Sequence, residues 1–140
     1  METIGDAYMC CAGLSMKQKE TRGGGAEPPE HHARRMVSFA KDILASAALV
    51  TTPDGDPVQV RIGLHSGDVM TGVVGHKMPR FCLFGDTVNV ASRMESTGRP
   101  GLIHVSQATR NLTPAEAWIS TGGVEAKGKG LMETYILNMK

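Results

Sequence analysis

The segment between Val69 and Phe84 constrains the fold of this chain more than any other part of its sequence. The apolar run Val69–Val74 is separated by a turn containing glycine and proline from a second apolar run, which ends at Phe84. Two apolar runs joined by such a turn predict a β-hairpin. Gly85 then lets the backbone change direction, and Asp86 can cap a helix by accepting a hydrogen bond from one of the amides that follow. We therefore expect a hairpin that leads directly into a helix.

This helix carries an amide and a guanidinium four residues apart, at Asn89 and Arg93. Residues at that spacing share one face of a helix. An arginine there could stabilise negative charge that develops on a phosphoryl group during substitution, and an asparagine could orient a neighbouring sugar or base. A capped helix with a surface arginine is also a common structural feature, so the segment alone leaves both interpretations open.

Hydrophobic periodicity predicts further strands and helices along the chain. Apolar positions at helical spacing indicate a helix over His31–Leu49, which would bury one stripe against a sheet. Strands are expected at Ala7–Leu14, Val58–Leu64, Leu102–Val105, Trp118–Glu125 and Glu133–Leu137, and a short helix at Gln107–Leu112. Strands that alternate with helices imply an α/β fold, here an α+β sandwich in which helices cover a mostly antiparallel sheet.

The composition fits one globular domain over residues 1–140. A chain of 140 residues with 41% hydrophobic content can bury one core but hardly two. Residues 17–30 are polar and rich in glycine and proline, so we expect a flexible surface loop there. The 15 lysines and arginines against 14 acidic residues give a net charge of +1. That charge provides no electrostatic footprint for nucleic acid or an anionic membrane.

The chain contains three cysteines, Cys10, Cys11 and Cys82. Their odd number, without the paired spacing of a zinc site, predicts reduced thiols in a cytosolic setting, with Cys10 and Cys11 packed in a strand. The apolar runs are shorter than the roughly 18 residues that span a bilayer, and the N-terminus carries no signal-peptide pattern. We expect a soluble, cytoplasmic domain, a location that is compatible with a membrane-anchored parent protein.

Four groups of residues recur together in one known family. They are the run Glu2–Met9, the run Arg61–Gly67, the hairpin and helix described above, and the turn Lys127–Gly130 with Glu133–Tyr135 after it. With these motifs the chain resembles the catalytic domain of class III nucleotidyl cyclases, of the guanylate cyclase type. Only the region at residues 17–30 looks unlike this family. The resemblance implies a ferredoxin-like α+β domain whose first strand and following helices would precede Glu2, so we expect an N-terminally truncated portion of that domain.

The resemblance also implies two divalent cations, Mg²⁺ or Mn²⁺, held by two aspartates. Asp6 matches the second of these aspartates. The first belongs to a Phe-x-Asp-Ile-x-x-Phe-Thr motif that should lie several tens of residues before Glu2 and is absent from this sequence. One cation would help to deprotonate the ribose 3′-hydroxyl, and the other would neutralise the triphosphate. Without the other motifs, Asp6 would be interpreted as an ordinary turn residue after Gly5.

Glu2 and Cys82 match the family's two purine-determining positions. Guanine presents donors at N1 and N2 and an acceptor at O6, which suit a carboxylate and a weak thiol donor. Adenylate cyclases typically carry lysine and aspartate at these positions. The resemblance therefore favours GTP and disfavours the adenylate cyclase alternative. Taken alone, Glu2 could simply be solvated and Cys82 could pack in the core.

Lys127 matches the family's triphosphate-binding lysine, in a turn whose glycines let the backbone approach a ligand. Asn89 and Arg93 match its ribose-orienting and transition-state residues. The family works as a dimer in which one subunit brings the metal aspartates and the other brings the remaining site residues. A homodimer, or a heterodimer with another cyclase domain, is therefore implied. The implied reaction converts GTP to 3′,5′-cyclic GMP and pyrophosphate in signal transduction.

These observations leave two functional interpretations. In the first, the chain is part of a guanylate cyclase catalytic domain and is inactive alone, because the missing strand and helices would leave sheet edges and an apolar face uncovered. In the second, it is a non-catalytic cyclase-like module that dimerises with a complete cyclase chain. The first is favoured, because a module freed from catalysis has no chemical reason to keep base, ribose and phosphate residues together.

Overall fold

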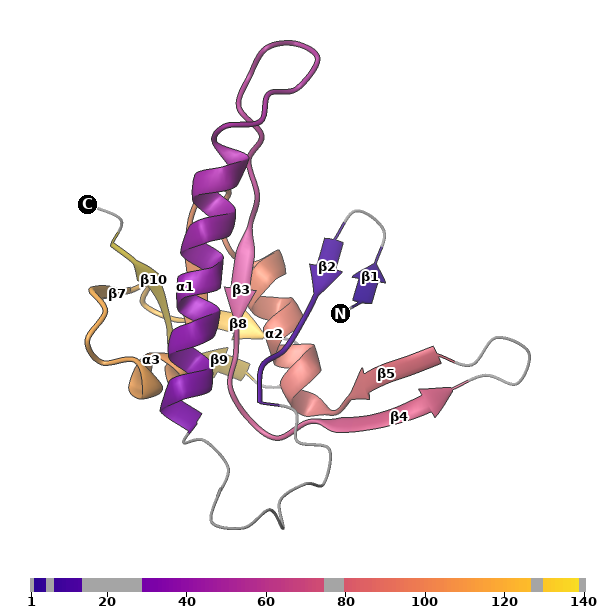
Figure 1. Ribbon diagram of the computed structural model, residues 1–140. Helices are drawn as coiled ribbons and strands as arrows, with labels where there is room; N and C mark the ends of the chain where they lie inside the picture. The colour runs from indigo at the N-terminus through magenta and orange to yellow at the C-terminus, as the bar shows by residue number, and fades with distance from the viewer. Residues whose placement is uncertain (1, 5–6, 14–28, 75–79, 127–129, 139–140) are drawn as a thin grey trace.

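We describe the protein from a computed structural model, which places residues 2–4, 7–13, 29–74, 80–126 and 130–138. Within these ranges the chain forms three helices and ten strands (Figure 1). The helices are α1 (Pro29–Ala47), α2 (Asp86–Ser96) and α3 (Gln107–Leu112). The strands are β1 (Glu2–Ile4), β2 (Ala7–Met9), β3 (Ile62–Leu64), β4 (Met70–Val74), β5 (Arg80–Phe84), β6 (Ile103–Ser106), β7 (Trp118–Ser120), β8 (Val124–Ala126), β9 (Gly130–Met132) and β10 (Thr134–Leu137).

The central sheet has four strands in the order β3–β6–β10–β7. β3 runs parallel to β6, whereas β10 runs antiparallel to both of its neighbours, β6 and β7. The predicted mostly antiparallel sheet is therefore confirmed. The register pairs His104 with Gly63 on one side and with Ile136 on the other, so these three residues form one row across the sheet.

Both faces of this sheet are covered by a helix. Successive residues of a strand point to opposite faces, and on one face Ile103 and Val105 form a buried core with Ala40 of α1. Further members of this core, buried or partly buried, are Leu44, Ile62, Leu64, Trp118, Tyr135 and Leu137. On the opposite face α2 packs against β3 and β6 and buries Val90 and Met94. The predicted α+β sandwich is confirmed.

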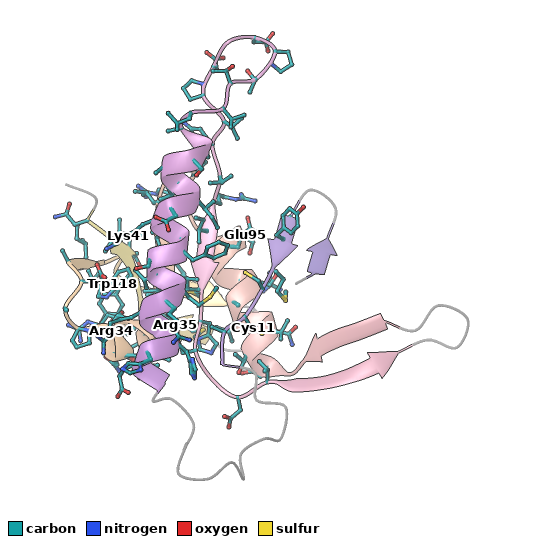
Figure 2. The ribbon with its side chains drawn as sticks, viewed as in Figure 1. Cys11, Arg34, Arg35, Lys41, Glu95 and Trp118 are labelled. Carbon is teal, nitrogen blue, oxygen red and sulfur yellow. The ribbon has the colours of Figure 1, made fainter. Side chains whose placement is uncertain are left out.

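Polar contacts connect α1 to the chain segment before β7. Lys41 Nζ donates to Glu116 Oε1 at 2.8 Å, and Figure 2 shows Lys41 on the side of α1 where Trp118 lies. The indole Nε1 of Trp118 donates to the Thr113 carbonyl at 2.9 Å.

None of the helices in the described ranges combines the length and the apolar character that a membrane span requires.

Three two-stranded hairpins accompany the sheet in the described residues: β1–β2, β4–β5 and β8–β9. The β4–β5 hairpin pairs Met70 with Phe84 and Val74 with Arg80. Figure 1 shows that this hairpin projects away from the helices and that β5 leads back to α2. The predicted hairpin that leads directly into a helix is confirmed.

Two predicted strands are shorter than expected. β2 ends at Met9, residues 10–13 are not in a strand, and Leu14 lies outside the described residues. The predicted strand Val58–Leu64 is a strand only over its last three residues. Its first part belongs to a separate turn, because the Val58 amide donates to the Val50 carbonyl at 2.8 Å instead of pairing in the sheet.

The predicted strand Trp118–Glu125 is divided into β7 and β8. Gly122 and Gly123 lie between them with φ angles of 86° and 100°, which a continuous strand does not permit. The predicted helix His31–Leu49 extends instead over Pro29–Ala47, and the rest of the predicted loop at residues 17–30 lies outside the described residues. The other predicted elements of the sheet and α3 agree to within one residue.

Candidate active site

Helix α2 begins immediately after Gly85. Gly85 has φ 115° and ψ 174°, a backbone conformation that favours glycine. Its carbonyl accepts from the amides of Val88 and Asn89, at 3.2 and 3.4 Å. The predicted cap by Asp86 is therefore wrong, because Gly85 occupies the N-cap position and Asp86 lies in the first turn. An acidic residue there is favourable, since the N-terminal end of a helix carries a partial positive charge.

Asn89 and Arg93 lie one turn apart on the exposed face of α2. The opposite face is buried at Val90 and Met94, which are 3% and 0% exposed. The shared face predicted from the four-residue spacing is therefore confirmed. Within the part of the chain that the structure describes, neither Asn89 nor Arg93 uses its side chain in a hydrogen bond or ion pair. Both polar groups are thus accessible to a ligand.

The rest of the protein holds α2 at both ends. In its first turn, Thr87 Oγ1 donates to the Asp68 carbonyl at 2.5 Å. Near its end, Gly63 of β3 lies so close to α2 that an added Cβ would be 2.1 Å from the Glu95 amide nitrogen. Arg61 Nε also donates to Glu95 Oε2 at 2.8 Å, and Glu95 is labelled in Figure 2. The direction of the exposed face is therefore set by β3 and by the loop that follows it.

The two predicted base-reading residues lie on different hairpins. Cys82 is in β5 opposite Gly72 of β4, and Glu2 is in β1 opposite Met9 of β2. β5 ends at Phe84, and the N-cap of α2 follows at once. Backbone continuity therefore keeps Cys82 close to the start of α2, whereas no such link joins Glu2 to that helix.

Asp6 and Lys127, the predicted metal and triphosphate residues, lie outside the described residues. In the sequence, Asp6 belongs to the connection between β1 and β2, and Lys127 to the connection between β8 and β9. Their roles stay predictions. In the described ranges, no group of three or more His, Cys, Asp and Glu side chains is placed to hold a metal ion.

A cavity of about 500 Å³ lies between β2, α1, α2 and the loop after β3. Neither Asn89 nor Arg93 lines it. The α2 residues that do, Thr87, Val88 and Ala91, are on a different side of the helix from Asn89 and Arg93. β2 pairs only with β1, and β3 only with β6, among the described strands. The cavity therefore marks a gap between two sheets, on a different side of α2 from Asn89 and Arg93.

Polar contacts beside this cavity were not predicted from the sequence. His65 Nδ1 and Ser106 Oγ are 2.5 Å apart, and Ser66 Oγ and Thr109 Oγ1 are 2.9 Å apart. They tie the loop after β3 to the end of β6 and to α3. The sequence pattern carries no signal for them, because the partners are 41 and 43 positions apart.

The cysteines near the cavity differ from their predicted setting. Cys10 and Cys11 follow β2 instead of packing within a strand, and both line the cavity. Both are free thiols, as predicted. Partial burial raises the pKa of the Cys11 thiol, so this group stays protonated at neutral pH.

The family described as the adenylate and guanylate cyclase catalytic domain matches residues 1–139 of this chain. The chain belongs to this family. The family predicted from the motifs is thereby confirmed over nearly the whole sequence.

A curated relative of this cyclase chain is the guanylate cyclase soluble subunit beta-2 of Rattus norvegicus. The two sequences are 46% identical over 140 residues, which cover 98% of this chain and 19% of the relative. The chain therefore spans about one fifth of the length of that relative.

Solved cyclase structures share the fold described above. The guanylate cyclase domain of RhGC from Catenaria anguillulae, solved in complex with GTP, matches with a TM-score of 0.74 and 42% identity over 83% of this chain and 63% of that one. A non-canonical dimeric guanylyl cyclase domain of the RhoGC fusion protein from Blastocladiella emersonii matches with a TM-score of 0.67 and 37% identity, over 82% of this chain and 62% of that one. The predicted class III cyclase fold is confirmed.

Proposed function

We propose that this chain forms part of a guanylate cyclase catalytic domain, which converts GTP to 3′,5′-cyclic GMP and pyrophosphate in signal transduction. The observation that carries the proposal is the exposed face of α2, where Asn89 and Arg93 lie one turn apart with no side-chain partner among the described residues. Family membership and the similarity to a GTP-bound guanylate cyclase domain support it.

In this proposal, the ribose 3′-hydroxyl of GTP attacks the α-phosphorus in line with the bond to the leaving pyrophosphate, without a covalent enzyme intermediate. Arg93 donates hydrogen bonds to phosphoryl oxygens that gain negative charge during the attack. Asn89, which lies one helical turn before Arg93, orients the ribose. Lys127 binds the triphosphate. Because Arg93 acts mainly on charge that develops in the transition state, it contributes more to turnover than to GTP binding.

Glu2 and Cys82 select guanine over adenine in the same proposal. The Glu2 carboxylate accepts hydrogen bonds from N1 and N2 of the base, and the Cys82 thiol donates to O6. Adenine reverses the donor and acceptor at this edge, so ATP would leave these groups unpaired. The adenylate cyclase alternative is disfavoured for that reason.

Divalent cations, Mg²⁺ or Mn²⁺, are implied beside the triphosphate. The donor chemistry of Asp6 fits them, because both ions prefer carboxylate oxygens. When bound, two such ions polarise the phosphate oxygens and acidify the attacking hydroxyl. The motif that carries the family's other metal aspartate is not found in this sequence.

We propose a site shared between two cyclase domains, in a homodimer or a heterodimer. Asp6 acts in one half, and the base, ribose and phosphate residues act from the other. A related guanylyl cyclase domain is described as dimeric. A homodimer contains two equivalent sites.

We place the domain in the cytoplasm, within a parent protein that is either soluble or membrane-anchored, and expect no nucleic acid partner.

The proposal is tested with a complete cyclase domain, made by joining this chain to a cyclase segment that carries the other metal aspartate. Cyclic GMP is measured with GTP and Mn²⁺. We expect Arg93→Ala to lower kcat about 100-fold to 1,000-fold, as for loss of one transition-state donor. The KM for GTP should change less than about threefold. Arg99→Ala removes another exposed arginine, after the end of α2, and serves as the matched control.

Equal losses in turnover and in GTP affinity would contradict the role of Arg93. A complete, folded domain that binds GTP but makes no cyclic GMP would contradict the proposed activity. That second result would favour the non-catalytic module.

A further inference from the structure

His104 is completely buried in β6, beneath α2. Its side chain is 1% exposed. The ring nitrogen Nδ1 lies 2.8 Å from the Met94 carbonyl oxygen. Because a carbonyl can only accept, Nδ1 carries the proton and donates it in this bond. The bond joins the central sheet to the residue that follows Arg93.

This hydrogen bond satisfies a carbonyl that α2 cannot satisfy itself. The last four carbonyls of an α-helix lack an intrahelical amide partner. The carbonyls of Arg93 and Glu95 accept from the two backbone amides that follow the helix, at 2.9 and 3.2 Å. The Met94 carbonyl lies between them and bonds to His104 instead. The last turn of α2 is therefore fixed partly by a side chain of the sheet.

The contact between this turn and the sheet leaves little free space. A Cβ added to Gly63, the β3 partner of His104, would lie 2.1 Å from the Glu95 amide nitrogen. A Cβ added to Gly98 would lie 3.0 Å from the Met94 carbonyl oxygen and 3.2 Å from His104 Cβ. In a close-packed contact of this kind, a change at His104 is passed on to the helix backbone.

We propose that His104 is a positioning residue for Arg93. Arg93 and Met94 leave the same turn in different directions, one exposed and the other fully buried. With the Met94 carbonyl held, the last turn cannot rotate freely about the helix axis, and the Arg93 guanidinium is presented in one direction. The inference rests on the proposed function, because it assumes that Arg93 acts in cyclic GMP formation. A misplacement of about 1 Å in such a group can cost about 100-fold in rate.

Three variants of the complete cyclase domain test this inference. His104→Leu removes the donor, whereas His104→Asn keeps an N–H donor on a shorter side chain. Val105→Ala is the matched control, because it alters the next buried residue of β6, whose side chain belongs to the core on the α1 face. We expect His104→Leu to lower kcat about 10-fold to 100-fold and to change KM for GTP less than about threefold. His104→Asn should recover most of kcat, and Val105→Ala should leave kcat per folded molecule unchanged.

A double-mutant cycle separates positioning from a general loss of stability. If His104 acts through Arg93, His104→Leu costs little further turnover once Arg93→Ala is present. Fully additive losses would overturn the inference, and so would equal changes in kcat and KM. Hydrogen exchange gives a readout independent of activity: His104→Leu should speed exchange of the amides at residues 94–98 but not in α1. Unchanged exchange in α2 would also overturn it.

The two proposals can fail separately. If Arg93→Ala leaves turnover unchanged, the assigned role of Arg93 in the proposed function is wrong. If Arg93→Ala lowers turnover as expected while His104→Leu has no effect, only the inference about His104 is wrong.

Discussion

Thr87, in the first turn of α2, donates a hydrogen bond from Oγ1 to the Asp68 carbonyl 2.5 Å away. Gly67, beside Asp68, has no room for a side chain there, because an added Cβ would lie 2.7 Å from Thr87 Oγ1. The start of α2 and the loop between β3 and β4 are therefore packed as one unit. This contact and the bond between His104 and Met94 hold the two ends of the helix that carries the candidate catalytic residues.

Replacing Thr87 with valine keeps the side-chain shape but removes the donor. We expect Thr87→Val to lower the free energy of unfolding by about 1 kcal/mol, because the Asp68 carbonyl loses its partner. Thr87→Ser keeps the hydroxyl and should cost less. Urea denaturation of both variants in the complete domain measures the difference. If Thr87→Val leaves the free energy of unfolding unchanged, the hydrogen bond does not contribute to stability.

The exposed face of α2 could be predicted from the sequence, because it depends only on a four-residue spacing within one helix. The capping residue could not be predicted to the right position. Gly85 and Asp86 are both favoured at helix starts, and the backbone angles of Gly85 decide between them. Local pattern thus predicts which element forms, whereas the backbone conformation that Gly85 adopts decides where it begins.

The contacts of Thr87 and His104 could not be predicted, for a different reason. Their partners are 19 and 10 positions away and come close only when α2 packs on the loop and on the sheet. The likeness to a family leads directly to Asn89 and Arg93, because those residues stand in its motifs. It gives no comparable signal for a buried histidine that supports them from the sheet.

Gly63 offers a test of the close approach between β3 and α2. An added Cβ would lie 2.1 Å from one backbone atom of α2 and 2.4 Å from another, so neither neighbour is a side chain that can rotate away. We expect Gly63→Ala to lower the free energy of unfolding by about 3 kcal/mol or more, as for overpacking in a core. Thermal unfolding of the complete domain measures the loss.

Gly55→Ala is the control for that substitution. Gly55 has φ 92° and open space around its Cβ position, so alanine there meets backbone strain without a clash. We expect Gly55→Ala to cost about 1 kcal/mol. If Gly63→Ala lowers the free energy of unfolding no more than Gly55→Ala does, α2 can shift on the sheet. The inference that its exposed face is held in one direction would then be wrong.

The 140-residue chain alone is expected to make no detectable cyclic GMP. β2 and β3 each have one described strand partner, and the cavity of about 500 Å³ lies between them. Among the described strands, the second edge of each has no partner, and exposed backbone donors and acceptors at such an edge favour association with other chains. The purified chain is incubated with GTP and Mn²⁺ while light scattering reports its size. Any detectable cyclic GMP formation by the chain alone would contradict this prediction.

Base selection by Glu2 and Cys82 can be tested by exchanging the hydrogen-bonding groups. The double variant Glu2→Lys and Cys82→Asp carries the residues that adenylate cyclases typically have at these two positions. In the complete domain, we expect the ratio of kcat/KM for GTP to that for ATP to fall at least about 100-fold, because the hydrogen-bonding groups that matched guanine now match adenine. Cyclic GMP and cyclic AMP are measured in parallel.

Cys11→Asp is the matched control for this exchange, since Cys11 is a free cysteine that follows β2 and is not one of the two predicted base-reading residues. This control should leave the ratio of kcat/KM for GTP to kcat/KM for ATP unchanged. If the double variant loses activity with both nucleotides to the same extent, the two positions support folding or catalysis but do not read the base. A shift toward ATP without loss of folded protein would instead assign guanine recognition to Glu2 and Cys82, because a general defect lowers both reactions and only a specific contact can favour one.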